Sequence, residues 1–354
     1  MSLFVFRCLV RKVVPGLLCA LLALPAAARV VDGLYSARIS VQDRSQASLD
    51  AAAREGLSEV LVKITGSREV LALPVLDRAV RDARDLLQQF SYQSAADGSD
   101  LAIELRFSSE TVRGLVIEAG APLWTANRPQ VLVWLVVDGP DGRQLVDAAS
   151  YPELVVRMQQ AFDRRGLPLV MPILDLEDVI ALSPGDAWRQ GLAHIMQASA
   201  RYPAEQVLVG RAAALSGDRW LGDWLLYDGR SRADRPVNAD SADAFLGAGV
   251  DLVAGVVAGR FALTSSVAGS TSGDRVEVSG VSGYSDYAAI VSWLESLELV
   301  EFANVEWLRG DRLTLRLVAQ TDLQSLRPLI ELNSRLVPDN RGGDGANLVY
   351  VWQK

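Results

Sequence analysis

The stretch "RPQVLVWLVVDG", residues 128–139, decides the fold of the middle of the chain. Its residues Val131 to Val137 are apolar without alternation. A short run of this kind, bounded by turn residues, is typical of a central strand that is covered on both faces. We therefore expect a sheet with this strand in its interior and other elements packed against both of its faces.

Helices and strands alternate after this strand, which predicts an α/β sandwich over residues 126–264. The capping box Ser150-x-x-Glu153, with Pro152 in the first turn, predicts the start of a helix that Gly166 ends. The remaining elements are expected to be a short strand that stops at Pro172, a helix from Ser183 to about Ala200, a hairpin turning at Ser216-Gly217-Asp218 and a helix from about Ser241 to Ala258.

On the amino-terminal side, residues 29–125 predict a small α+β module. The alternation in "LYSARISVQ", residues 34–42, indicates a half-buried strand. Apolar residues at helical spacing follow, and Gly66 predicts a left-handed end of that helix. Further elements are expected to be a helix over Val75 to Leu87, a hairpin around Ala96-Asp97-Gly98, a return strand that buries Leu101, Ile103, Leu105 and Phe107 and exposes Ala102, Glu104 and Arg106, and a helix from Thr111 to Ala119.

On the carboxyl-terminal side, small polar residues at 265–274 predict a linker. Residues 275–354 then predict a ferredoxin-like βαββαβ module. Its elements are expected to be a strand at Val276 and Val278, a helix over Tyr287 to Leu297, a hairpin turning at Arg309-Gly310-Asp311, a helix capped by Asp322 and kinked at Pro328, and a last strand over Leu348 to Trp352. The fold class expected for the chain is therefore α/β and α+β in three modules.

Residues 1–28 have the three parts of a secretory signal peptide. A basic start precedes a short apolar run, and Ala26-Ala27-Ala28 offers a cleavage site. We expect cleavage after about Ala28, a periplasmic location and no membrane span in the mature chain. Two alternatives stay open: an uncleaved amino-terminal anchor, and a lipid on Cys19, although Leu18 is not the small residue that lipid attachment requires.

Cleavage would leave a chain with few reactive groups. It would remove Cys8 and Cys19, the only two cysteines, so no disulfide, thiol nucleophile or thiolate ligand is expected. It would also take the formal charge from -8 to -11, which makes nucleic acid and anionic membranes poor partners. His194, the single histidine, is interpreted as a helix-surface or packing residue rather than a general base. No metal site, cofactor or catalytic residue is predicted.

Two weaker patterns have structural interpretations. The acidic residues Asp175, Glu177 and Asp178 follow the end of a predicted strand and could hold a hard cation, but a solvated loop is the preferred interpretation. Gly255 and Gly259 have the spacing of a close helix contact, which we assign to a neighbouring strand or side chain.

Two pairs of residues are candidates for binding a partner. Trp220 and Trp224 share one face of a predicted strand and could form a docking surface, although burial under the helix from Ser241 to Ala258 is the preferred interpretation. Trp124 and Arg128 lie where the first two modules join. We interpret them as an interdomain wedge, with a partner site as the minority alternative.

Three blocks carry a resemblance to a known family: "REGLSEVLVKITGS", "GAPLWTANRPQVLVWLVVD" and "VSGYSDYAAIVSWLESLELVEFANVEWLRGDRLTLRL". They resemble the proteobacterial exported family catalogued as domain of unknown function 2066, which implies a periplasmic location and no particular reaction. The segments "LVVRMQQAFDRRGLPLVMP" and "AEQVLVGRAAAL" give the middle module a fainter likeness to the amino-terminal domain of TolB and to lipoprotein activators of cell-wall synthases. That likeness implies protein docking.

We therefore expect a non-enzymatic periplasmic protein that docks to envelope proteins or assists envelope assembly. The first alternative is a hydrolase of the cell envelope that uses carboxylates alone, which would need acidic side chains converging in a pocket. The second alternative is a small-ligand carrier, which would need a large apolar cavity between modules.

Overall fold

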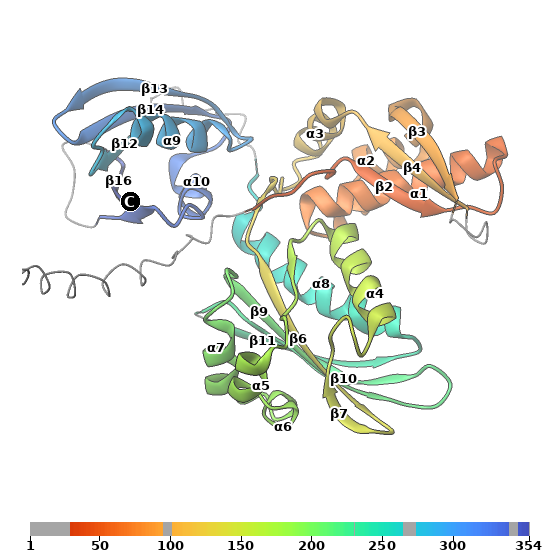
Figure 1. The fold of residues 1–354 in the computed structure, drawn as a ribbon. Coiled ribbons are helices and arrows are strands. Elements are labelled where there is room, and N and C mark those ends of the chain that lie inside the picture. The colour runs from red at the N-terminus through yellow and green to blue at the C-terminus, as the bar shows by residue number, and fades with distance from the viewer. Residues whose placement is uncertain (1–28, 95–100, 230, 265–273, 340–345, 354) are drawn as a thin grey trace, which may run out of the picture.

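Three modules, each built on its own sheet, make up the fold (Figure 1). The computed structural model describes residues 29–94, 101–229, 231–264, 274–339 and 346–353. The expected signal peptide, the turn at Ala96-Asp97-Gly98 and nearly all of the expected linker lie outside these residues. The mixed α/β and α+β fold class is confirmed.

The amino-terminal module is an antiparallel three-stranded sheet, in the order β2-β4-β3, with a long helix, α1, packed on one face. Gly66 ends α1 in the left-handed conformation, with φ 81°, as the sequence predicts. Two details differ from the sequence prediction. The second helix ends at Arg81 and is followed by a 3-10 helix over Ala83–Leu86 before the strand that starts at Leu87, and Ala102 is buried. The elements are β2 (Ser36–Ser40), α1 (Gln46–Thr65), α2 (Pro74–Arg81), β3 (Leu87–Ser94), β4 (Leu101–Phe107) and α3 (Ser109–Glu118).

The middle module is a six-stranded sheet between two layers of helices. Its central strand β6 is the apolar run identified in the sequence, and Val131 to Val137 are all buried. Odd-numbered residues of this run face the core under α4 and α8, and even-numbered residues face the core under α6 and α7. The elements are β6 (Val131–Gly139), β7 (Gly142–Leu145), α4 (Pro152–Arg165), β8 (Leu169–Val170), α5 (Leu176–Ala181), α6 (Pro184–Trp188), α7 (Leu192–Ser199), β9 (Gln206–Ala214), β10 (Trp220–Tyr227), β11 (Arg232–Ala239) and α8 (Ala242–Phe261).

Several predictions for the middle module were wrong in detail. The capping box does not form, because Tyr151 occupies the N-cap of α4 without a side-chain hydrogen bond. The helix expected from Ser183 to Ala200 is broken into α6 and α7, since Gln190 has a φ of 53° and ends the helical run before Gly191. The strands β7 and β11 were not predicted. Both are polar strands at the edges of the sheet, so they lack the apolar pattern of buried strands.

In the described part of the chain, α8 is the one helix long and apolar enough to cross a membrane, and 56% of its most apolar window is buried inside the protein. It packs against α4, β10 and β11 as a core helix. Gly255 and Gly259 lie on its exposed side with open space around them. The close contact expected at these two glycines is therefore not present.

The carboxyl-terminal module contains the expected series of strands and helices and one additional strand, β15. The sheet order is β13-β14-β12-β16-β15, and β16 runs parallel to β12 and antiparallel to the edge strand β15. Leu313, Leu315 and Leu317 face the core as predicted. The elements are β12 (Asp274–Ser279), α9 (Tyr284–Glu295), β13 (Val300–Arg309), β14 (Arg312–Ala319), α10 (Leu323–Ile330), β15 (Leu336–Pro338) and β16 (Leu348–Trp352).

The three modules meet at a two-stranded ladder of β1 (Arg29–Val30) and β5 (Asn127–Arg128). Side chains from the carboxyl-terminal module contact this ladder, since Glu298 accepts a hydrogen bond from the backbone N–H of Ala126 at 3.1 Å. Asn127 donates to the carbonyl of Ser296 at 3.3 Å. The ladder therefore connects all three modules near the centre of the molecule (Figure 1).

Candidate functional site

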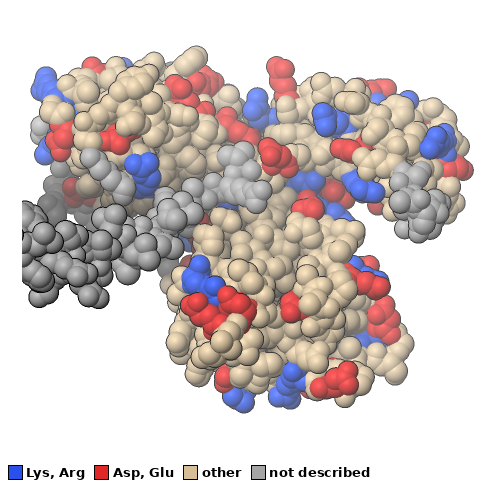
Figure 2. Space-filling model, in the orientation of Figure 1, with Lys and Arg blue, Asp and Glu red and all other residues tan. Residues whose placement is uncertain are grey.

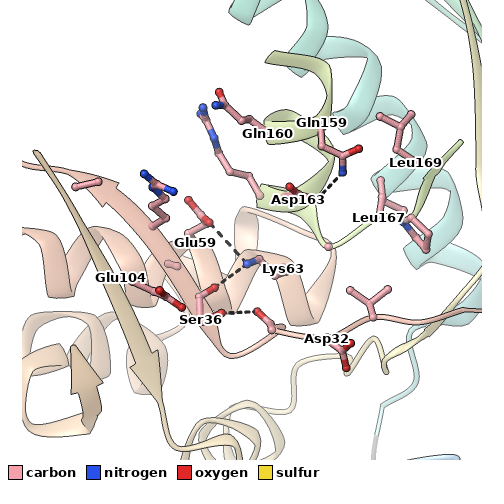
Figure 3. Close-up of a pocket in the computed structure, with 18 of the residues that line it drawn as sticks. Asp32, Ser36, Glu59, Lys63, Glu104, Gln159, Gln160, Asp163, Leu167 and Leu169 are labelled. Atoms are coloured by element: carbon pink, nitrogen blue, oxygen red, sulfur yellow. Dashed lines mark hydrogen bonds and ion pairs between the residues drawn. The ribbon is translucent and has the colours of Figure 1, made fainter. Parts of the chain in front are cut away.

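A cleft of about 1080 Å³ separates the sheet of the amino-terminal module from helix α4 of the middle module. Figure 3 shows Ser36, Glu59 and Lys63 on one wall and Gln159, Gln160 and Asp163 on the other. Polar and charged side chains of both signs dominate the lining. A site of this size can accommodate a small molecule or an extended segment of a polypeptide.

The edge strand β2 runs along this cleft. Residues Ser36 to Ser40 pair with β4 on one side, and β2 is the last strand of its sheet on the other side. Tyr35 and Val41 exchange hydrogen bonds with β4, at 2.9 Å to Phe107 and 2.8 Å to Leu101. Because hydrogen bonding alternates along an antiparallel strand, the backbone N–H and C=O groups of Arg38 and Ser40 point the other way, toward the cleft.

Lys63 of α1 contacts the free edge of β2 at its amino-terminal end. It is the only lysine among residues 29–353, and it is almost fully buried. Its ammonium group donates to the carbonyl of Ser36 at 2.8 Å and lies 3.7 Å from the Glu59 carboxylate. Burial lowers the pKa of Lys63, and the charge of Glu59 opposes that shift. Burial likewise raises the pKa of Glu59, and the charge of Lys63 opposes it. The pair therefore places one acidic and one basic group in the cleft wall, and burial shifts the pKa of each toward its neutral form.

Two residues of the cleft lining, Lys63 and Gly166, accept backbone hydrogen bonds from Arg128, whose side chain is fully buried. All five of its N–H groups donate to backbone carbonyls, those of Lys63, Trp124, Thr125, Arg165 and Gly166, at 2.8–3.0 Å. These acceptors include the last carbonyls of α1 and α4, which lack partners within their own helices. Burial lowers the pKa of Arg128 to about 9, and the Glu298 carboxylate opposes the shift.

Trp124 lies against Arg128, with the guanidinium 3.8 Å from the centre of its ring. Trp124 is also fully buried, and its backbone N–H donates to Ile64 at the end of α1. The two residues thus occupy the wedge position between the first two modules that the sequence indicates. Neither presents a surface to a partner in this structure.

The tryptophans of β10 have different positions. Trp224 is fully buried against α8, where its indole N–H donates to the carbonyl of Phe245 at 3.0 Å. Trp220 is half-buried and lines a smaller pocket of about 480 Å³, together with Tyr151, Pro152 and Val137. This pocket lies beyond the carboxyl ends of the parallel strands β6 and β9, where α/β sheets commonly bind ligands. Trp220 is therefore the one candidate partner residue with a partly accessible ring.

The remaining polar candidates have structural roles. Asp175 caps α5 and, with Asp178, forms ion pairs with Arg201 at 2.6 and 3.2 Å. His194 is exposed on α7. Within the described residues, no group of three or more histidine, cysteine or acidic side chains is arranged to hold a metal ion.

Comparison with known proteins gives one family match. Residues 28–125 match the model of a domain of unknown function, DUF8605. No curated protein matches the sequence. Among solved structures, a crystal structure described as that of an uncharacterized protein is 12% identical and covers 37% of this chain and 97% of its own, with a TM-score of 0.16. A formyltetrahydrofolate deformylase from Pseudomonas putida KT2440 is also 12% identical and covers 54% of this chain and 88% of its own, with a TM-score of 0.18. TM-scores this low carry no argument about fold or function.

The family match corrects the resemblances inferred from the sequence blocks. The matching family is not domain of unknown function 2066, and the match is confined to the first third of the chain. The likeness of the middle module to TolB and to synthase activators finds no support either. The helix–strand rhythm and the "RRGLPLV" segment that suggested it are features of many α/β modules, so they did not identify one family.

Sequence reasoning did not find the cleft. The strand β2 and the helix α1 were both predicted, but their alignment with α4 depends on contacts between residues far apart in the chain. One feature of the sequence could have indicated the cleft: Lys63 is an isolated lysine in an otherwise apolar stretch of α1. A buried ammonium group needs partners, so its position marks a polar site.

Proposed function

We propose that this protein is an exported, non-enzymatic docking protein that binds an extended segment of an envelope protein in the cleft beside β2. The observation that carries the proposal is the free backbone edge at Arg38 and Ser40. Addition of a strand to an exposed sheet edge is a common mode of peptide recognition, because the backbone hydrogen bonds supply affinity without requiring one particular sequence. The mixed charges of the lining suit a polar segment. The pattern of residues 1–28, which predicts a secretory signal peptide, supports export to the periplasm.

The test uses a proline at the free edge. Arg38→Pro removes the N–H group that points into the cleft and leaves the ladder with β4 intact, since proline is accepted on the outer side of an edge strand. The matched control, Arg38→Ala, removes the side chain and keeps the N–H. Peptides selected from a display library on the purified mature protein should bind R38P about tenfold or more weakly than wild type, and R38A about as well as wild type.

Hydrogen exchange gives a second readout that does not depend on a variant. A bound strand should slow exchange of the Arg38 and Ser40 amides, while the amides of Ala37 and Ile39 are already protected by β4. Equal binding by wild type and R38P, or unchanged exchange at Arg38 and Ser40, would rule out docking at this edge. Recovery of native protein that still carries residues 1–28 would contradict release into the periplasm.

A carboxylate-dependent hydrolase is the second candidate, and the raised pKa of Glu59 is the observation that favours it. A carboxyl group whose pKa is raised by burial in a cleft is a candidate general acid. A hydrolase would release soluble fragments from purified envelope polymers, and Glu59→Gln would abolish the release. The polar lining of the large cavity gives no corresponding support to a carrier of apolar ligands.

A further inference from the structure

Helix α5 has its polar side turned inward. Asp178 is fully buried, and its carboxylate accepts hydrogen bonds from the backbone N–H of Leu174 at 2.9 Å, from the Tyr202 hydroxyl and from Arg201. Arg201 also forms a two-point contact with Asp175, at 2.6 and 2.9 Å. These contacts attach α5 to the end of α7 and fix which side of the helix faces outward.

The outward side is apolar. Leu176 and Ile180 are each 76% exposed, Val179 is 51% exposed, and Ile173 in the preceding turn is 69% exposed. The spacing of the three helical residues places them on one face. We call Ile173, Leu176, Val179 and Ile180 the α5 patch. Single exposed aliphatic residues are ordinary on protein surfaces, but a contiguous group of this kind marks an interaction site.

The charges around the α5 patch favour one class of partner over others. Two partly exposed carboxylates, those of Asp175 and Glu177, lie beside the patch and share one cation, Arg201, which also contacts the buried Asp178. Figure 2 shows acidic side chains beside uncharged surface on the middle module. An anionic lipid surface would be repelled by these carboxylates, and a second copy of α5 would set acidic residues against acidic residues. A cationic partner is attracted.

The size of the patch indicates a small binding element. A stable interface between folded proteins takes about 20–30 residues from each side, far more than these four. Three side chains at helical spacing fit the apolar face of one short amphipathic helix. We propose that the α5 patch docks a basic amphipathic helix of a partner protein, with its Lys and Arg residues beside Asp175 and Glu177. This surface lies on the middle module and is independent of the β2 cleft.

The experiment uses two synthetic helices of about 18 residues, a length that gives about five turns. Both carry leucine at i, i+3, i+4 and i+7; one has lysine and the other has glutamate at the remaining positions. The lysine helix should bind the mature protein saturably and about tenfold or more tightly than the glutamate helix. Leu176→Ser with Ile180→Ser should weaken binding of the lysine helix about tenfold or more. Val156→Ser, at a 55% exposed position on α4, should leave it unchanged.

A charge reversal makes the test specific. Glu177→Lys leaves the apolar residues in place and should reduce the preference for the lysine helix over the glutamate helix. Equal binding of the lysine helix to wild type and to the double variant would overturn the proposal, as would equal affinity of wild type for the two helices. If the double variant, but not V156S, lost binding to phosphatidylglycerol vesicles, the patch would be assigned to a membrane instead. If the double variant, but not V156S, lost dimers that sedimentation detects, the patch would be assigned to a second copy of the chain.

Discussion

Arg128 shows how one residue can fix the junction of two modules. Its guanidinium is buried, no carboxylate of the described residues forms an ion pair with it, and five carbonyl oxygens surround it. Two of the helices it contacts, α1 and α4, end there, and a cation at a helix carboxyl terminus is favoured by the helix dipole. The backbone carbonyls thus take the place of a counter-ion.

We predict that Arg128→Lys lowers the free energy of unfolding by about 3–5 kcal/mol. Lysine keeps the charge but has three donors on one atom, so it cannot reach five acceptors arranged around a planar fork. Urea unfolding of the mature protein measures the effect. Arg164→Lys, an exposed neighbour on α4, is the control and should change stability by less than about 0.5 kcal/mol. Equal midpoints for the two variants would show that the carbonyl cage does not stabilise the junction.

At the scale of the element, α8 packs against the sheet because glycine opens a space for Trp224. A Cβ added at Gly249 of α8 would lie 2.5 Å from the Trp224 ring, and Gly210 of β9 faces the same ring from the sheet. On the opposite side of the same helix, Gly255 has open space around it. Packing against Trp224 therefore requires glycine at position 249 of α8, whereas the space around Gly255 would admit a larger residue.

We predict opposite effects for the same substitution at these two positions. Gly249→Ala should destabilise the protein by about 1–3 kcal/mol, since the added methyl group overpacks the Trp224 site. Gly255→Ala should stabilise it by about 0.5–1 kcal/mol through the higher helix propensity of alanine. Thermal unfolding followed by circular dichroism measures both. A loss of stability in G255A, or no loss in G249A, would contradict the packing described for this helix.

At the scale of the whole molecule, the carboxyl-terminal module is held to the β1–β5 ladder by polar contacts. Glu298 accepts from Ala126, and its charge acts on residues of the other modules. Burial raises the pKa of Tyr35 to about 12, and Glu298 adds to the shift. Tyr35 therefore reports whether Glu298 lies at the ladder in solution.

We predict that Glu298→Gln lowers the pKa of Tyr35, because the negative charge that opposes tyrosinate formation is removed. The folded Tyr35 pKa lies above the unfolded value of 10.0, so the folded state keeps the proton longer. The stability that this provides is complete below pH 10 and is lost as the pH rises toward 12. Ultraviolet absorbance of tyrosinate, corrected with Tyr35→Phe, measures the shift. The control is Glu301→Gln, at an exposed position on β13, which should leave the pKa of Tyr35 unchanged. An unchanged Tyr35 pKa in E298Q would show that the carboxyl-terminal module does not dock against the β1–β5 ladder as described.

Local patterns in the sequence were sufficient to predict most elements. The apolar run from Val131 to Val137 predicted a buried strand, and Gly66 predicted the end of α1, because burial on both faces and a positive φ each restrict the residues that can occupy a position. The polar edge strand β11 was missed, since an edge strand is specified by its neighbour and not by its own apolar pattern. The break at Gln190 was missed because a left-handed residue other than glycine has no strong sequence signal.

The sequence by itself determined the mixed α/β and α+β fold class, the buried central strand β6 and the end of α1 at Gly66, since each depends on composition or on a pattern within a few turns of chain. Only the tertiary structure decided that β2 lines a cleft, that Arg128 is held by carbonyls from two helices, and that the apolar face of α5 points outward. Each of these arises where residues far apart in the chain come together. Their relative positions depend on packing energies summed over whole modules, which no local pattern records.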